Sequence, residues 1–175
     1  MPNIYREQPA ASEYIAYYGR YIALVPDGDI LAQLERQAAE TARLLAGLSA
    51  ELADHRYAPG KWSIKEVVGH VTDAERIFAH RALRFARGDT ISLPGFDENA
   101  YVPAGEFGDR SLADLSAELR AVRAATLAMF RGFPEVAMTR MGVASDAAVS
   151  VRALAWISAG HELHHVKLLR ERYLA

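Results

Sequence analysis

The chain has 175 residues, of which 51% are hydrophobic and 24% charged, and this is enough for one domain with a substantial core. Its formal net charge is -2, so it has no overall basic field that would attract nucleic acid, and nucleic-acid binding is disfavoured. The chain contains no cysteine, which excludes disulfides, thiolate metal sites and a cysteine nucleophile, so any metal must be held by nitrogen and oxygen.

Residues 1–28 form a tyrosine-rich arm, in which Ser12 and Glu13 are predicted to cap a short helix that runs through Leu24. We expect its tyrosine rings to cover the outside of a helical core or to make a subunit contact. The arm lacks the basic start and apolar centre of a signal sequence, and no later stretch approaches an uninterrupted membrane span. We therefore expect a soluble, cytoplasmic protein with no membrane partner.

The single domain predicted for residues 29–175 begins with two long amphipathic helices, over residues 29–48 and 63–87. A capping box opens the second of them, and an arginine followed by a glycine ends it. His70 and Arg81 lie on its inward stripe. Because they are eleven residues apart, they return to almost the same angle three turns later.

The second half of the domain contains a long loop and two more helices. The loop over residues 88–110 carries prolines, glycines and aromatic side chains, and a loop of this length is usually functional or a lid. The third helix, over residues 111–132, offers no metal ligand on its apolar face, so we expect a structural role. After an irregular connection over residues 135–149, the last helix begins at Ser150. Four long amphipathic helices without a convincing strand predict an all-α four-helix bundle.

Three histidines at inward positions predict a metal site. His161 and His165 lie one turn apart on the last helix, about 40° from each other around its axis, and His70 faces inward from the second helix. Burying three imidazoles without partners is costly, whereas one shared metal satisfies all three and leaves positions open for water or substrate. His164 is a poorer alternative ligand, and we expect His80 to lie at the surface or against a partner.

The run His161-Glu162-Leu163-His164-His165 also matches the zinc-protease pattern His-Glu-x-x-His. A protease of that type needs a third ligand further downstream and a sheet that binds the peptide. None of the ten residues after His165 is His, Cys or Asp, and no strand is predicted. We therefore disfavour a protease and expect Glu162 to be solvated or to face a subunit.

From about residue 29 onward, the chain resembles the DinB/YfiT-like superfamily of small metal-binding four-helix proteins. The resemblance implies a bundle with a long crossover, a metal triad of His70, His161 and His165, zinc or nickel as the metal, and a homodimer. The matching stretches are Gly60-Lys61-Trp62-Ser63-Ile64-Lys65-Glu66-Val67-Val68-Gly69-His70, Asp73-Ala74-Glu75-Arg76, and Gly160-His161 with His165.

Characterised relatives in this superfamily include transferases and isomerases that use bacillithiol, mycothiol or glutathione. The resemblance therefore implies a thiol-dependent S-transferase for small molecules, in which the metal binds a low-molecular-weight thiol and lowers its pKa. One alternative is a metal-dependent hydrolase that activates water. Others are a non-catalytic, stress-associated dimer that the metal stabilises, and a bundle whose histidines only form hydrogen bonds.

Four further residues are candidates for contacts with a substrate or cofactor. Arg81 can hold an anionic group of a substrate, or it can make an interhelical salt bridge. Asp97, Asn99 and Tyr101 belong to a segment of the long loop, residues 96–101, that we expect to overhang the metal and select the substrate.

Overall fold

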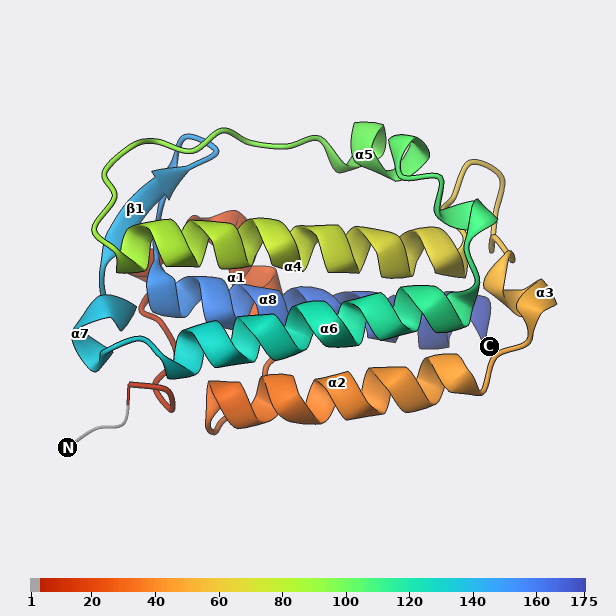
Figure 1. Cartoon of the computed structure of the whole chain (residues 1–175), viewed down its shortest axis with the longest axis horizontal. Helices are drawn as coiled ribbons and strands as arrows, with labels where there is room; N and C mark the ends of the chain where they lie inside the picture. The colour runs from red at the N-terminus through yellow and green to blue at the C-terminus, as the bar shows by residue number, and fades with distance from the viewer. Residues whose placement is uncertain (1–3) are drawn as a thin grey trace.

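The structure is a computed structural model that describes residues 4–175, so the first three residues of the arm lie outside the described part. Four long helices run side by side along the molecule, and a small β-hairpin lies at one end (Figure 1). Within residues 4–175, no helix is both long and apolar enough to cross a membrane. The predicted four-helix bundle is confirmed, and its helices are α2 (Ile30–Ala46), α4 (Ile64–Ala86), α6 (Leu112–Arg131) and α8 (Val151–Leu168).

Shorter elements connect the long helices. The crossover from α4 to α6 passes over the outer side of α4 and contains α5, and the N-terminal α1 packs on α8 (Figure 1). The short helices are α1 (Ala16–Ile22), α3 (Ala50–Ala53), α5 (Glu98–Ala104) and α7 (Glu135–Met138), with 3₁₀ turns at Ala11–Glu13 and Phe107–Asp109 and a π turn at Leu169–Tyr173.

Each long helix begins at a side chain that accepts a hydrogen bond from a backbone N–H of the first turn. Asp29, Ser63, Ser111 and Ser150 are these caps, and each contributes about 1 kcal/mol to helix stability. The predicted capping box is present, because the backbone N–H of Ser63 donates to Glu66 Oε2 at 2.6 Å and the backbone N–H of Glu66 donates to Ser63 Oγ at 3.2 Å.

Helix α8 is the central helix of the bundle. Residues 153–162 are buried without interruption, although one inward face was expected, because α1, α2 and α4 all pack around this helix. Gly160 allows α1 to come especially close. A Cβ atom at this position would lie 2.1 Å from the backbone oxygen of Tyr21, so the backbone of α1 rests directly on α8 beside His161.

The prediction that the chain has no strand was wrong. The connection over residues 135–149 contains α7 and an antiparallel hairpin of β1 (Met141–Ala144) and β2 (Ala147–Ser150). Its two turn residues, Ser145 and Asp146, have φ angles of 53° and 58°, as a type I′ turn requires. These two positions do not carry the Asn-Gly or Asp-Gly pair that usually marks such a turn in a sequence.

The start of the arm also differs from the prediction. Helix α1 begins after Ile15 with no side-chain cap, so Ser12 and Glu13 do not open it. The Glu13 carboxylate instead accepts hydrogen bonds from Ser150 Oγ at 2.7 Å and from Arg152 Nε at 2.8 Å. The arm is therefore tied to the first turn of α8.

A buried ion network links the four long helices. Arg123 on α6 donates from Nε and Nη2 to both carboxylate oxygens of Glu75 on α4, each at 2.7 Å. Its Nη2 also donates to Glu162 on α8 at 2.8 Å, and its Nη1 donates to the backbone oxygen of Leu34 on α2 at 2.8 Å. Thr41 Oγ1 donates to the remaining Glu162 oxygen at 2.7 Å.

The expectation that Glu162 is solvated or faces a subunit is therefore wrong. The exposed fraction of Arg123, Glu75 and Glu162 is only 2–3%. Burial alone would lower the pKa of the Arg123 guanidinium, but the two carboxylates raise this pKa above its usual value. The third long helix thus contributes the central cation of the bundle as well as an apolar face.

We expect Arg123→Met to lower the free energy of unfolding by about 3–5 kcal/mol, because two buried carboxylates lose their cation. Urea denaturation measures this change. The matched control is Arg131→Met on the same helix, where the pair with Glu35 has side chains that are 53% and 63% exposed. That exposed pair should contribute less than about 1 kcal/mol. Equal effects of the two substitutions would contradict the structural role of the network.

Candidate metal centre

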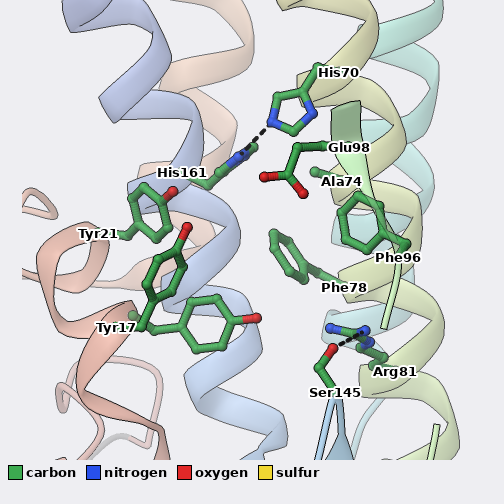
Figure 2. Close-up of a pocket in the computed structure, with 11 residues that line it drawn as sticks. Tyr17, Tyr21, His70, Ala74, Phe78, Arg81, Phe96, Glu98, Ser145 and His161 are labelled. Carbon is green, nitrogen blue, oxygen red and sulfur yellow. Dashed lines mark hydrogen bonds between the residues drawn. The ribbon is translucent and has the colours of Figure 1, made fainter. Parts of the chain in front are cut away.

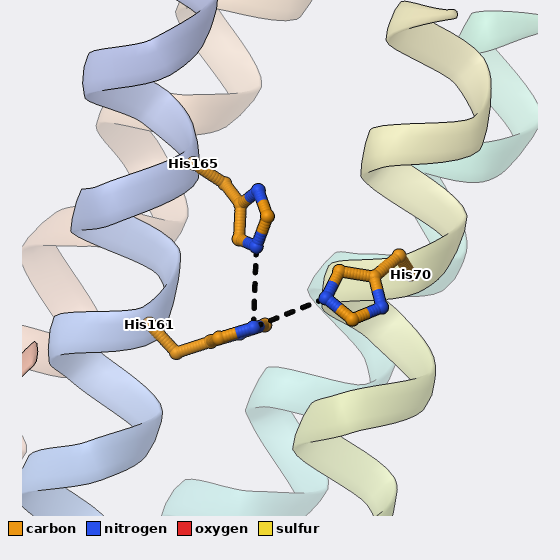
Figure 3. A group of neighbouring side chains, drawn as sticks. All are labelled: His70, His161 and His165. Atoms are coloured by element: carbon orange, nitrogen blue, oxygen red, sulfur yellow. Dashed lines mark hydrogen bonds between the residues drawn. The ribbon is translucent and has the colours of Figure 1, made fainter. Parts of the chain in front are cut away.

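Helices α4 and α8 bring three imidazole nitrogens to one point (Figure 3). His70 Nε2 lies 3.1 Å from His161 Nε2, and His165 Nε2 lies 3.2 Å from the same atom. One ring nitrogen from each residue lies within 4.8 Å of the others. The structure therefore brings together the three histidines that the helix periodicity selected.

Hydrogen bonds alone do not satisfy this cluster. Each nitrogen of a neutral imidazole carries either one proton or one lone pair, so His161 Nε2 cannot make good hydrogen bonds to both neighbours at once. His165 Nδ1 is buried and has no hydrogen-bond partner within the described chain. A divalent cation bound by the three Nε2 lone pairs removes the conflict, and three neutral imidazoles are a suitable donor set for zinc or nickel.

Burial keeps the three imidazoles neutral. Loss of solvation lowers the pKa of His70 to about 4. It also lowers the pKa of His165 to about 3, and the neighbouring His70 and His164 contribute to this second shift. The pKa of His161 is also held well below its usual value, first by burial and then by its two histidine neighbours. At neutral pH each ring therefore presents a free lone pair, which is the form that binds a metal.

The cluster lies at one end of a cavity of about 140 Å³ (Figure 2). His70 and His161 line this cavity, whereas His165 lies behind them. The wall is built from five parts of the chain: α4, α8, α1, the crossover between α4 and α6, and the hairpin. The other lining residues are Ala74, Phe78 and Arg81 of α4, Tyr17, Tyr18 and Tyr21 of α1, Phe96 and Glu98 of the crossover, and Ser145 of the hairpin.

The tyrosines of α1 do more than cover the outside of the bundle, contrary to the expectation for the arm. The ring of Tyr21 is 5.3 Å from that of His161 and 5.4 Å from that of His164, between centroids. Arg20 Nη2 donates to the Tyr21 hydroxyl at 2.8 Å. Burial raises the pKa of Tyr21 to about 12, so its hydroxyl stays protonated beside the histidines.

Glu98 is a cavity residue that the sequence reasoning missed. It lies in the first turn of α5, and its carboxylate is directed into the cavity near His70 (Figure 2). The candidates Asp97, Asn99 and Tyr101 are exposed and do not line this cavity, and Asp97 Oδ1 accepts the backbone N–H of Asn99 at 2.9 Å as the cap of α5. No signal in the sequence pointed to Glu98, because three polar residues in a row, Asp97, Glu98 and Asn99, show no alternation that would mark one of them as inward.

The remaining histidines lie outside the triad. His164 is half-buried beside Tyr21, and His55 is exposed. His80 is also exposed, in agreement with its predicted place at the surface. Arg81 lines the opposite end of the cavity from His70, and it makes no salt bridge with any residue in the described part of the chain. The interhelical salt bridge considered for Arg81 is therefore not formed.

Comparison with known proteins supports the family resemblance. A sequence model of the DinB superfamily matches residues 33–169, a segment that includes all three histidines. Among solved structures, YfiT from Bacillus subtilis matches with a TM-score of 0.69 and 17% identity, over 94% of this chain and 93% of that chain. That protein is described as a probable metal-dependent hydrolase with an unusual four-helix bundle topology. No curated protein sequence matches the chain.

We expect the untagged protein, loaded with zinc or nickel and desalted, to retain about one ion per chain. His161→Ala should weaken binding by at least about 100-fold, because it removes the nitrogen that lies between the other two. Elemental analysis and competition with a chromogenic chelator measure the loss. His164→Ala, on the same helix but outside the triad, is the matched control and should bind normally. Equal metal content in the two variants would exclude the site.

The pKa values also predict how the metal-free protein responds to acid. The unfolded chain binds protons on its histidines below about pH 6.5, whereas His70 and His165 in the folded chain take them up only near pH 4 and pH 3. Stability should therefore fall as the pH drops below 6.5, by about 1.4 kcal/mol per pH unit for each buried histidine. Urea denaturation at pH 7.5 and pH 5.5 measures the change.

Two variants provide controls for this pH dependence. His80→Gln removes an exposed histidine and should lose as much stability between pH 7.5 and pH 5.5 as the wild type. His165→Leu removes one buried imidazole and should lose less stability over the same range. Equal stability of the wild-type protein at the two pH values would contradict neutral, buried imidazoles.

Proposed function

The chain is a member of the DinB superfamily, and on this basis we propose that it is a metal-dependent enzyme acting on small molecules. The observation that carries the proposal is the position of the histidine triad in the wall of a cavity. Structural metal sites are closed by protein ligands, whereas catalytic sites keep a position open for water or substrate. Here His70 and His161 line the cavity, so the open side of the site faces its interior.

His70, His161 and His165 would hold the ion, with zinc or nickel as the proposed metal. When bound, such an ion lowers the pKa of a thiol or a water molecule and so supplies a nucleophile near neutral pH. The side chains around it have separate tasks. The rings of Phe78 and Phe96 exclude bulk water, and the tyrosine hydroxyls of α1 are donors for an oxygen that gains charge during the reaction.

Our first candidate reaction is transfer of a low-molecular-weight thiol to a small electrophile. The family resemblance supports it, and so does the mixed lining of the cavity, where the aromatic rings lie beside one acidic and one basic side chain. A thiol that binds as a thiolate needs no further base at the moment of attack. The small-molecule substrate and the homodimer that the resemblance implies belong to the same proposal.

Hydrolysis is the second candidate, and Glu98 favours it. A carboxylate in the cavity near the site can accept a proton from an attacking water and pass it to the leaving group. The structural match to YfiT, with its description as a probable metal-dependent hydrolase, points the same way. A non-catalytic metal-binding dimer is the remaining alternative, and an absence of any turnover would support it.

We expect the metal-loaded protein to accelerate the reaction of a chromogenic electrophile with at least one member of a panel of small thiols. His161→Ala should abolish the acceleration, and His164→Ala should keep it. Absence of metal-dependent acceleration with every thiol would exclude thiol transfer. Glu98→Gln then separates the two reactions, because loss of a general base slows hydrolysis by about 10²–10⁴-fold. Attack by a bound thiolate should change far less in this variant.

A further inference from the structure

Arg81 is a buried cation that has no anionic partner among residues 4–175. Its exposed fraction is 3%, and Nη2 donates to the backbone oxygen of Pro94 and to Ser145 Oγ, both at 2.9 Å. Nε and Nη1 make no hydrogen bond to any residue from 4 to 175. Figure 2 shows the guanidinium extending below Phe78 into the cavity that it lines.

Arg123 is a second buried arginine of the described chain, and its partners can be compared with those of Arg81. Arg123 is 2% exposed, and two carboxylates and a backbone oxygen surround it. A buried charge is costly unless it is paired and hydrogen-bonded. The half-buried Arg84 and Arg152 also have carboxylate partners within the described chain. Arg81 therefore differs from these arginines, and the space beside it is open to a ligand.

We propose that Arg81, with Ser145, is an anion subsite that binds the carboxylate of a small substrate. The apolar part of this substrate lies along Phe78 and Phe96, and its reacting end faces the histidine triad. The claim that the substrate reacts at the histidine triad rests on the proposed enzymatic function. The anion subsite itself does not depend on that function, because it contains none of the three histidines. Arg81 is thus a binding residue that orients the substrate along the cavity.

The shape of the cavity supports a ligand with two distinct ends. His70 and Arg81 lie on the same face of α4, roughly 16 Å apart along its axis, and the long side chain of Arg81 leans back toward His70. Ala74 leaves room between them. The cavity of about 140 Å³ is close to the ~150 Å³ that holds one benzene molecule. A carboxylate joined to one ring, or to a chain of similar size, fits this space.

Charge favours a carboxylate over a phosphate. Among the described residues that line the cavity, Arg81 is the one cationic side chain, and Glu98 contributes a carboxylate. A dianion would meet one cation and one anion. A monoanion needs only the charge of a single guanidinium, and it can accept a hydrogen bond from Nη1 or Nε of Arg81, which have no partner among the described residues.

The test compares 3-phenylpropanoate with 3-phenylpropanamide by isothermal titration calorimetry on the full-length protein. The metal-free form is decisive, because a carboxylate can also bind zinc directly. We expect the acid to bind at least about tenfold more tightly than the amide. Arg81→Gln should remove this preference, and Arg81→Lys should restore only part of it, because lysine keeps the charge but lacks the planar set of donors of a guanidinium. Arg120→Gln, which removes an exposed arginine of α6, is the control and should bind like the wild type.

Equal binding of acid and amide by the unaltered protein would overturn the proposal, and this comparison decides the question even if Arg81→Gln does not fold. A preference that persists in a folded Arg81→Gln variant would also overturn it. Tighter binding of phenyl phosphate than of the acid would contradict the choice of carboxylate. Acid binding without any metal-dependent turnover would support the subsite and count against the enzymatic function. Turnover without acid preference would contradict the subsite alone.

Discussion

The ion network of Arg123 determines how the four long helices sit against one another. One guanidinium on α6 reaches carboxylates on α4 and α8 and a backbone oxygen on α2, so a rotation of any of these helices would break a buried hydrogen bond. Such networks add little net stability over an apolar core, but they accept few arrangements. Since Glu162 directly follows His161 in α8, the contact that holds Glu162 also sets the direction of the histidines.

Helices α4 and α8 each carry a buried carboxylate on one side and an imidazole of the histidine triad on another. On α4, Glu75 and His70 lie about 140° apart around the axis, so the carboxylate faces α6 while the imidazole faces α8 and the cavity. On α8, Glu162 and His161 are similarly divided. The charged cluster around Arg123 and the neutral histidine cluster therefore lie on different sides of α4 and α8. The single positive charge of Arg123 is held between two carboxylates, and the imidazoles remain neutral by burial.

The parts of this protein that follow from local periodicity were predictable from its sequence. Three- and four-residue spacing located the long helices, and the same spacing placed His161 and His165 on one face with His70 as an inward partner. Contacts made only in the tertiary structure were not predictable. Helix spacing alone predicted a surface position for Glu162, and only the tertiary structure brings Arg123 against it. Glu98 reaches the cavity from the crossover, and Ser145 reaches it from a strained turn of the hairpin. Asp97, Asn99 and Tyr101 are exposed and do not line the cavity, so their predicted role above the metal stays a prediction.

The contact between Gly160 and the backbone of Tyr21 distinguishes the positions of this site that tolerate substitution from the one that does not. Because the contact is made by main-chain atoms, exchange of the tyrosines of α1 would leave the path of the arm unchanged. The wall of the cavity can thus be changed by side-chain replacement while His70, His161 and His165 stay in place. Position 160 has no such freedom, since any side chain there would lift the arm from α8. The fold therefore combines a fixed main-chain contact for the arm with a cavity lining whose side chains can be exchanged around the three histidines.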